Sequence, residues 1–338
     1  MTATLLISDA AKTDAGPAMH RIARERGVAL SCLTPSDLAQ APHRIAQVTG
    51  AWFSRDVFAA ARAGTRPSAM KDFFAVVDAA PGLDWLHVMS AGADFPEYRA
   101  SQARGVRLTT SSGVTSVPIA HTVVAAVLAQ ARGFPAWLDA QSRRTWQPVL
   151  GANSPRDLSE QTAVIVGLGP IGREVARLLR AFGMRTVGVR QQHLPCPDVD
   201  RTLTYETLET VLPECDWLIL ACPLSPITHG LLDARRLALL PRRARVVNVG
   251  RGAVVDESAL TDALARQALA GAYLDVFCKE PLAADSRLWS LPNVWISPHN
   301  AAASLGNPAR DRQLFLDNLG QWLAGEPLRN LSASSAAV

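Results

Sequence analysis

The sequence predicts an α/β protein with two domains, each built on a parallel sheet with helices on both faces. Its 338 residues are enough for two domains, given roughly 150 residues per domain. Short apolar runs alternate with segments of helical periodicity along nearly the whole chain. This alternation is typical of parallel sheets. It is interrupted once, by a segment rich in Arg, Trp and Pro that ends near Asp157, and then starts again.

The composition is that of a folded chain without a polyanionic partner. With 48% hydrophobic residues, 19% charged residues and a mean hydropathy of +0.09, the chain is too apolar to remain disordered. The formal charge of +4 is carried almost wholly by arginine, since only Lys12, Lys71 and Lys279 are lysines. The arginines are spread along the chain, which indicates neither a nucleic-acid nor a membrane partner.

The cysteines and the N-terminus predict a cytoplasmic protein. The 5 cysteines are widely spaced and form no Cys-x-x-Cys pair, which favours free thiols in a reducing compartment. The N-terminal residues lack the basic region of a signal peptide. No apolar run approaches the ~18 residues of a membrane span. No His/Cys spacing suits zinc, so no metal site is predicted.

The first part of the chain predicts one layered α/β region. Two of its helices end at local stop signals, Gly27 and Pro81-Gly82. Trp52-Phe53 ends a further short apolar run and has two interpretations, lining a substrate pocket or packing in the core. Parallel sheets bind ligands outside the carboxyl ends of their strands, so loop 90–94 is a candidate by position. Strands are expected over 5–8, 28–33, 85–89 and 106–110, and helices over 19–26 and 69–79.

The second part predicts a complete doubly wound domain. A long helix over 117–132 leads into the interrupting segment, and a last helix is expected over 309–323. Between them lie six short apolar runs separated by helical segments, the number of strands in a complete doubly wound sheet. These strands are expected over 163–166, 186–189, 217–222, 245–248, 271–276 and 294–297.

A glycine-rich string, Gly167-Leu168-Gly169-Pro170-Ile171-Gly172, is the strongest local signal. It follows the apolar strand AVIV and opens an amphipathic helix, which is the context that a dinucleotide fingerprint requires. Gly167 would allow the tight turn, Gly169 the close approach of a pyrophosphate, and Gly172 close helix–strand packing. The alternative is a glycine-rich turn that binds nothing.

Arg190 points to the identity of the dinucleotide. An acidic residue about 20 residues after the fingerprint normally binds the ribose 2′-hydroxyl. Here the second strand ends in Arg190, followed by Gln191, Gln192 and His193. A guanidinium can bind a 2′-phosphate through charge-assisted hydrogen bonds, whereas a carboxylate would repel it. We therefore expect NADP(H) to be preferred, with NAD(H) still possible; the alternative is an exposed arginine without a role.

Three further groups follow the carboxyl ends of strands of the same sheet. They are the Asn248–Gly252 loop with Arg251, the Asp275–Glu280 segment, and the Ser297–Asn300 turn with His299. Each has an ordinary interpretation by itself: a solvated charge, a turn, or a surface histidine. Because the carboxyl ends of parallel strands share one edge of the sheet, the three groups can converge on one crevice.

Five strings in this region carry a family resemblance: GLGPIGREVARLLRAFGM, ACPLSPITHGLLD, VVNVGRGAVVDESAL, YLDVFCKEPL and LWSLPNVWISPHNA. They cover most of residues 160–303. VMSAGAD and GVTSVPIAHTVVAAVLA match more loosely. The chain resembles the D-2-hydroxyacid dehydrogenases, and most closely their glyoxylate/hydroxypyruvate reductase branch.

The resemblance implies catalytic roles for three residues. Arg251 would bind the carboxylate and the carbonyl oxygen of a 2-keto acid, for which a planar fork of donors is suited. His299 would be the general acid/base, and Glu280 would pair with it and keep the imidazole protonated near neutral pH. The backbone N–H groups of Ala91 and Gly92 would form the second carboxylate site.

The same resemblance implies cofactor contacts and an overall layout. Cys222 and Pro223 would contact the dinucleotide, and Asp275 would orient its carboxamide. A Rossmann-type domain (117–304) would be inserted into a flavodoxin-like substrate domain (1–116 and 305–338), with the active site in the cleft between them. Family members dimerise through the long helix and the arm that follows it, so we expect a homodimer through residues 117–146.

The expected reaction is NADPH-dependent reduction of glyoxylate or hydroxypyruvate to the D-2-hydroxy acid. Two alternatives stay open. One is the same chemistry on a bulkier 2-keto acid. The other is a nucleotide-sensing, protein-binding module like the C-terminal-binding-protein corepressors, which keep the Arg/Glu/His set.

Overall fold

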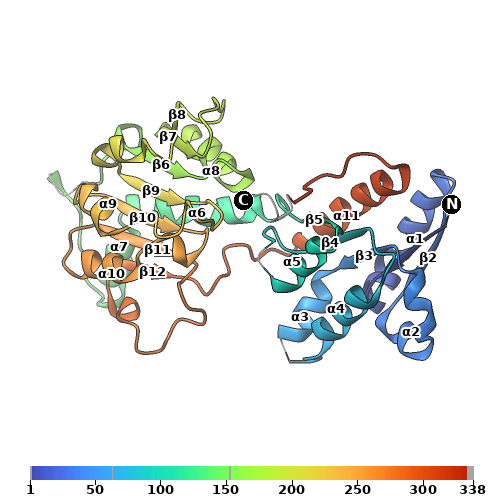
Figure 1. The fold of residues 1–338 in the computed structure, drawn as a ribbon. Helices are drawn as coiled ribbons and strands as arrows, with labels where there is room; N and C mark the ends of the chain where they lie inside the picture. The colour runs from blue at the N-terminus through green and yellow to red at the C-terminus, as the bar shows by residue number, and fades with distance from the viewer. Residues whose placement is uncertain (1, 63, 94, 152–153, 333–338) are drawn as a thin grey trace. The chain divides into compact units, whose positions relative to one another are not determined.

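The computed structural model describes residues 2–62, 64–93, 95–151 and 154–332. The chain divides into two compact units. The first, here called the split unit, consists of the residues up to Val114 and those from Leu305 onward. The second, the inserted unit, is Thr115–Ser304. Each unit contains one parallel sheet with helices against both faces (Figure 1).

The sheet of the split unit has the order β2-β1-β3-β4-β5, which is the flavodoxin-like order. Its strands are β1 (Thr2–Leu6), β2 (Ala29–Leu33), β3 (Gly50–Phe53), β4 (Trp85–Val88) and β5 (Arg107–Thr110). Its helices are α1 (Asp9–Glu25), α2 (Pro35–Gln40), η1 (Pro42–Gln47), α3 (Arg55–Arg62), α4 (Ala69–Ala79), α5 (Pro96–Ala103) and α11 (Asn307–Ala324). Helix α11, from the end of the chain, lies against α1 (Figure 1).

Neighbouring residues of β3 pack into the core on opposite faces of this sheet. Successive residues of a strand point to opposite faces. Trp52 therefore stacks on Phe315 of α11, with ring centroids 4.0 Å apart, while Phe53 packs against Phe73 and Phe74 of α4. Both strand residues are buried, Trp52 to 4% exposure. Both side chains therefore pack in the core, and Trp52 also lines a pocket of about 400 Å³ beside α11, so its substrate-pocket interpretation stays a prediction.

The sheet of the inserted unit has the order β12-β11-β10-β9-β6-β7-β8, with every pair parallel. The order reverses between β6 and β9, as in a Rossmann-type sheet. The strands are β6 (Thr162–Val166), β7 (Arg185–Arg190), β8 (Arg201–Thr204), β9 (Trp217–Leu220), β10 (Arg245–Asn248), β11 (Gly271–Leu274) and β12 (Val294–Ile296). The helices are α6 (Ser116–Ala131), α7 (Phe134–Ser142), η3 (Leu158–Glu160), α8 (Pro170–Ala181), η4 (Leu208–Thr210), η5 (Leu212–Glu214), α9 (Ala234–Leu239), η6 (Gly252–Val254), α10 (Glu257–Ala265) and η7 (Arg287–Ser290).

The predicted α/β fold class is confirmed, and the six strands expected in the second part of the chain are all present. The expected strand count was nevertheless one too low, because β8 is a seventh strand. It is four residues long, lies at the sheet edge and buries only Leu203, so its sequence lacks the apolar run of an inner strand. Helix α7 was also missed.

Within the described residues, no single helix is long and apolar enough to cross a membrane. Only the pair α6–α7 meets the length and composition test when taken together, and it is bent by 68°.

Candidate active site

The glycine-rich turn between β6 and α8 is built by three glycines with different surroundings. Gly167 has φ +100°, and a Cβ there would lie 2.6 Å from the Cys222 nitrogen. A Cβ on Gly172 would lie 1.9 Å from the Gly167 carbonyl oxygen. A Cβ on Gly169 would meet no atom within 4 Å. Two glycines thus permit close backbone packing, while the third faces open space.

Unpaired backbone donors surround that open space. Gly169 is the N-cap residue of α8 and makes no side-chain cap hydrogen bond, and Pro170 begins the helix. The N–H groups of Leu168 and Gly169 donate to no acceptor in the described part of the chain. A helix N-terminus with uncapped N–H groups binds phosphate oxygens well. The residues present therefore fit the pyrophosphate of a dinucleotide.

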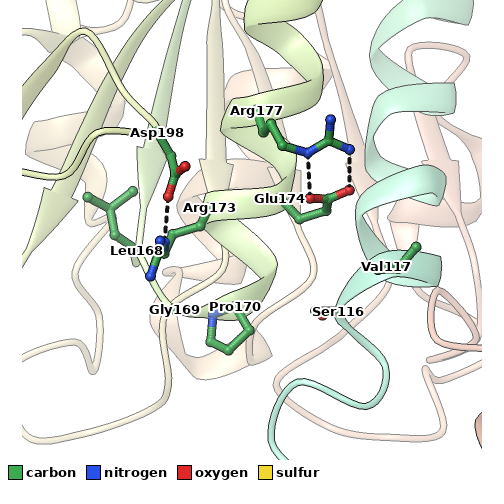
Figure 2. A pocket seen from close by; sticks show the side chains of 9 residues that line it. All are labelled: Ser116, Val117, Leu168, Gly169, Pro170, Arg173, Glu174, Arg177 and Asp198. Atoms are coloured by element: carbon green, nitrogen blue, oxygen red, sulfur yellow. Dashed lines mark hydrogen bonds and ion pairs between the residues drawn. The ribbon is translucent and has the colours of Figure 1, made fainter. Parts of the chain in front are cut away.

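A pocket of about 370 Å³ adjoins this turn (Figure 2). It is lined by Gly169, Pro170 and Ser116, and by two ion pairs that arginines of α8 make. Arg173 binds Asp198, and Arg177 binds Glu174. The Arg177 guanidinium lowers the pKa of the Glu174 carboxyl. Asp198 lies in the loop after β7, so this loop brings a carboxylate to the glycine turn, a feature that sequence reasoning missed because Asp198 is eight positions beyond the strand end.

Arg190 is the last residue of β7 and is half-buried. Two residues earlier, Gly188 leaves space that the Leu168 side chain fills, since a Cβ there would lie 2.5 Å from Leu168 Cδ1. This contact joins β7 to the glycine-rich turn. Among the residues that the structure describes, the Arg190 guanidinium makes no hydrogen bond or ion pair.

Cys222 and Pro223 follow β9, the strand beside β6. The Cys222 backbone abuts Gly167, and its side chain is buried, which raises the pKa of the thiol to about 11. Pro223 is exposed, and its carbonyl accepts a hydrogen bond from Thr228 Oγ1 at 2.7 Å. Pro170 and Ile171 of the glycine-rich string are also predicted cofactor contacts, and Ile171 is half-buried against the apolar cluster that includes Val175 and Leu179.

The Arg251 loop is shaped by its neighbours on both sides. Asn248 accepts from the Gly250 N–H at 3.1 Å and donates to the Arg251 carbonyl at 3.1 Å. A Cβ on Gly250 would lie 2.7 Å from the Cys222 oxygen, and one on Gly252 would lie 1.9 Å from the Phe277 carbonyl carbon. The loop therefore fits between the ends of β9 and β11. The Arg251 side chain is half-buried, and Nη1 donates to the Gly250 carbonyl at 2.9 Å.

Glu280 and His299 are brought together although 19 residues separate them. Glu280 Oε2 lies 2.8 Å from His299 Nδ1, and Oε1 accepts from the Phe277 N–H at 3.1 Å. The carboxylate is thus held by the backbone on one oxygen and by the imidazole on the other. Nδ1 is the donor in this pair, which leaves His299 Nε2 as the ring atom available to a substrate.

Asp275 holds the turn that carries His299. Its backbone carbonyl accepts from the His299 N–H at 2.9 Å, and His299 has φ +56°. Its carboxylate Oδ1 accepts from the N–H groups of Asn300 and Ala301, at 2.8 and 2.9 Å, and from the Ser297 hydroxyl. Tyr273 in turn lies 2.7 Å from Ser297 Oγ. Sequence reasoning named Asp275 but missed Ser297 and Tyr273, since neither carries a charge.

The candidates from the split unit lie in the loop after β4. Ser90 Oγ donates to the Gly92 carbonyl at 2.7 Å. The N–H groups of Ala91 and Gly92 donate to no acceptor within the described ranges. Asp94, the end of the predicted site loop, lies outside the described residues. Trp52 is in the core of the same unit, stacked on Phe315.

Comparison with known proteins identifies relatives over most of the chain. Residues 124–301 match the family model described as D-isomer specific 2-hydroxyacid dehydrogenase, NAD binding domain. Glyoxylate/hydroxypyruvate reductase B of Pectobacterium carotovorum is 35% identical over 264 residues, which cover 77% of this chain and 81% of that protein. Glyoxylate reductase of Korarchaeum cryptofilum is 32% identical over 263 residues, covering 76% and 78% of the two chains.

Solved structures agree in fold over the full length. The D-isomer specific 2-hydroxyacid dehydrogenase from Xanthobacter autotrophicus Py2, in complex with NADPH and MES, has a TM-score of 0.76 and 28% identity, and covers 99% of both chains. The NADPH-dependent glyoxylate/hydroxypyruvate reductase from Sinorhizobium meliloti, at 22% identity, shares the fold with a TM-score of 0.75 over 99% of this chain and 100% of that one.

Proposed function

The chain belongs to the D-isomer specific 2-hydroxyacid dehydrogenase family and is an oxidoreductase, and we propose that it reduces a small 2-keto acid, glyoxylate or hydroxypyruvate, with NADPH. The product is the 2-hydroxy acid, of D configuration where a stereocentre forms. The observation that carries the proposal is the His299–Glu280 pair, with Nδ1 and Oε2 2.8 Å apart. A carbonyl reduction needs such a proton donor.

Substrate binding requires an anion site for the carboxylate. Arg251 contributes a guanidinium, whose five N–H donors let it bind a loop carbonyl and a substrate oxygen at once. Ala91 and Gly92 contribute backbone N–H groups that have no protein acceptor among the described residues. Preorganised donors of this kind stabilise developing negative charge without reorganising.

Proton delivery falls to His299. When bound, a nicotinamide dinucleotide supplies the hydride that forms the new C–H bond. As the carbonyl electron pair moves onto oxygen, His299 Nε2 gives that oxygen its proton. Glu280, bonded to Nδ1, stabilises the positive charge of the imidazolium before the transfer. Asp275 keeps the ring in place through the turn that it holds; its further role in orienting a carboxamide stays part of the proposal.

The preference for NADPH rests on Arg190. This half-buried guanidinium at the end of β7 has no partner within the described part of the chain and stands where the sequence fingerprint places the ribose substituent. Asp198, the carboxylate that the β7 loop brings to the glycine-rich turn, is paired with Arg173. A 2′-phosphate is therefore the group that Arg190 would bind.

We further propose a homodimer through the arm that follows α6. Several large apolar side chains are exposed along this arm. Monomeric proteins rarely expose so many neighbouring apolar side chains, and such patches usually mark a protein interface. The exposed side chains are Phe134, Trp137, Leu138, Trp146 and Leu150, with Trp146 96% and Leu150 74% exposed.

One experiment tests the reaction and separates it from its alternatives. Oxidation of NADPH and of NADH is measured against glyoxylate, hydroxypyruvate, pyruvate and phenylpyruvate. We expect NADPH oxidation with the two small acids. If only phenylpyruvate is turned over, the proposed substrate is wrong and a bulkier 2-keto acid takes its place. If only NADH is oxidised, the proposed preference for NADPH is wrong. No turnover with any pair would overturn the enzyme proposal.

A further inference from the structure

A chain of buried polar side chains runs beneath the loop after β4 in the split unit. Trp85 Nε1 donates to Thr109 Oγ1 at 2.8 Å, and Thr109 Oγ1 lies 2.8 Å from His87 Nδ1. On the other side of the ring, Nε2 lies 3.2 Å from Ser111 Oγ, and Ser111 donates to Asp311 of α11. All five side chains are almost wholly buried, Asp311 to 2% exposure.

The direction of each proton in this chain follows from its last member. Ser111 has one hydroxyl proton and donates it to the Asp311 carboxylate, so the Ser111 oxygen accepts from His87 Nε2–H. Burial lowers the pKa of His87 to about 3, so the ring is neutral and its single proton is on Nε2. Nδ1 therefore carries no proton and accepts from the Thr109 hydroxyl, whose oxygen accepts from the Trp85 N–H. The ionised Asp311 is the acceptor at which the chain ends.

The last two members of the chain also hold the loop. The Ser111 N–H donates to the Ser90 carbonyl at 2.8 Å. Asp311 Oδ2 lies 3.6 Å from Arg55 Nε, and Arg55 Nη2 donates to the Met89 carbonyl at 3.3 Å. Two successive carbonyls are thus fixed immediately before the Ala91 and Gly92 N–H groups, which donate to no acceptor among the described residues.

We propose that Asp311 is a positioning residue, whose carboxylate holds Ser111 and Arg55 so that the Ala91 and Gly92 N–H groups bind the carboxylate of the 2-keto acid. This inference rests on the proposed function, because it takes those two N–H groups as a substrate site. Asp311 itself is buried behind the loop and acts on the substrate only through Ser111 and Arg55. Its loss should therefore weaken substrate binding and leave the chemical step largely intact.

The arrangement depends on the charge of Asp311. Burial raises the pKa of this carboxyl to about 6, with the Ser111 hydrogen bond and Arg55 acting in the opposite direction. Below that pH the neutral carboxyl no longer attracts Arg55, and the Ser111 hydroxyl can turn to the Val88 carbonyl, 3.0 Å away. Four charged groups line the same pocket of about 400 Å³ as Asp311: Arg55 and Asp56 (α3), Asp14 (α1) and Arg312 (α11). His87 (β4) is the remaining titratable group, and it is linked to Asp311 through the Ser111 hydroxyl.

The test is the pH dependence of KM in Asp311→Asn, which keeps the shape and removes the charge. In the wild type, KM for glyoxylate should rise about tenfold as the pH falls from 7.5 to 5, with a midpoint near 6, the size expected for one charge-assisted bond. In D311N, KM should be high and flat over this range, and kcat should stay within about twofold. The control is D317N on the same helix, since Asp317 pairs with exposed Arg329; it should follow the wild type. A wild-type KM profile in D311N would overturn the proposal.

A second measurement does not depend on turnover. Nitrogen-15 spectra of the full-length protein should show the Nε2–H tautomer of His87, and the Ala91 and Gly92 amide signals should shift with a midpoint near pH 6 in the wild type but not in D311N. Protonation of His87 on Nδ1, or pH-independent Ala91 and Gly92 signals, would refute the directed chain. If these signals behave as expected but no 2-keto acid is reduced, the proposed function fails and the Asp311 arrangement stands.

Discussion

His299 Nδ1 lies 2.8 Å from Glu280 Oε2, and the His299 backbone is left-handed, with φ +56°. A left-handed conformation costs a non-glycine residue roughly 1–2 kcal/mol. Here it is offset by the bonds from the His299 N–H to Asp275 and by the Asp275 side chain, which binds the next two N–H groups. These hydrogen bonds thus stabilise a backbone conformation that directs the His299 imidazole toward the Glu280 carboxylate.

Glu280→Gln should impair catalysis and spare cofactor binding. The amide removes the negative charge that stabilises the imidazolium, so kcat/KM for glyoxylate should fall by about 10²–10³. His299→Ala should abolish reduction. Steady-state kinetics measure both effects, and NADPH fluorescence titration should show an unchanged Kd. Glu206, which is exposed beside Thr204, provides the control variant E206Q. Wild-type kcat/KM in E280Q would remove Glu280 from its assigned role.

Arg190→Ala should weaken NADPH binding selectively. Losing charge-assisted hydrogen bonds to a 2′-phosphate should raise the Kd for NADPH by roughly 10–100-fold, while the Kd for NADH changes little. Arg185, exposed at the other end of the same strand, is the matched control, and R185A should bind both cofactors normally. Equal effects of R190A on the two cofactors would show that Arg190 does not contact the phosphate.

Alanine at two glycines of the same turn should have opposite consequences. In Gly172→Ala the new Cβ would lie 1.9 Å from a backbone oxygen, so the backbone must shift and Tm should fall, with a cost of about 1–3 kcal/mol or more. In Gly169→Ala the Cβ enters open space, so Tm should not change, but NADPH binding should weaken at least about tenfold because the methyl group occupies the approach of the pyrophosphate. Thermal unfolding and cofactor titration separate the two, and a G169A variant that binds NADPH normally would contradict the assigned site.

Asp311→Asn should gain stability relative to the wild type as the pH rises. The folded-state pKa of about 6 is above the ordinary 3.8, so the native state binds more protons between these values and the wild type loses stability as the pH rises through this window. The full effect of about two pKa units is about 3 kcal/mol. Urea unfolding at pH 4.5 and pH 7 measures this effect. The free energy of unfolding of D311N minus that of the wild type should become more positive as the pH rises. A constant difference would mean that Asp311 does not titrate in this range.

Trp146→Glu should weaken the proposed dimer. The residue is 96% exposed in the single chain, so a carboxylate there costs the fold nothing but would be buried in an interface. Light scattering after size-exclusion chromatography should give a dimer for the wild type and a lower mass at equal concentration for W146E. The control is Trp289→Glu, at a tryptophan that is 52% exposed and lies outside the arm; it should leave the mass unchanged. A monomeric wild type would remove the dimer from the proposal.

Much of the candidate site could be proposed from the sequence because its signals are local. The glycine string carries its own context of strand and helix, and Arg251, Glu280 and His299 each follow a strand of one parallel sheet, where topology brings strand ends to one edge. Helix α4 and strand β10 have the predicted bounds, since their stop signals lie within a few residues. Strand β8 was missed because an edge strand of four residues is held by pairing with β7 and carries little apolar pattern of its own.

The sequence by itself determined the layered α/β fold and the glycine-rich turn after β6, and it singled out three charged candidates at strand ends, Arg251, Glu280 and His299. Tertiary structure alone decided which side chains from distant segments pair with one another. Ser111 and Asp311 are 200 residues apart, Tyr273 and Ser297 are 24 apart, and Asp198 reaches Arg173 by a loop. Periodicity and turn signals report the conformation of neighbouring residues, whereas a hydrogen bond between distant segments depends on how whole elements pack. Trp52 shows the same limit: its strand was readable, but its stacking on Phe315 of α11 became visible only when the last helix was placed against β3.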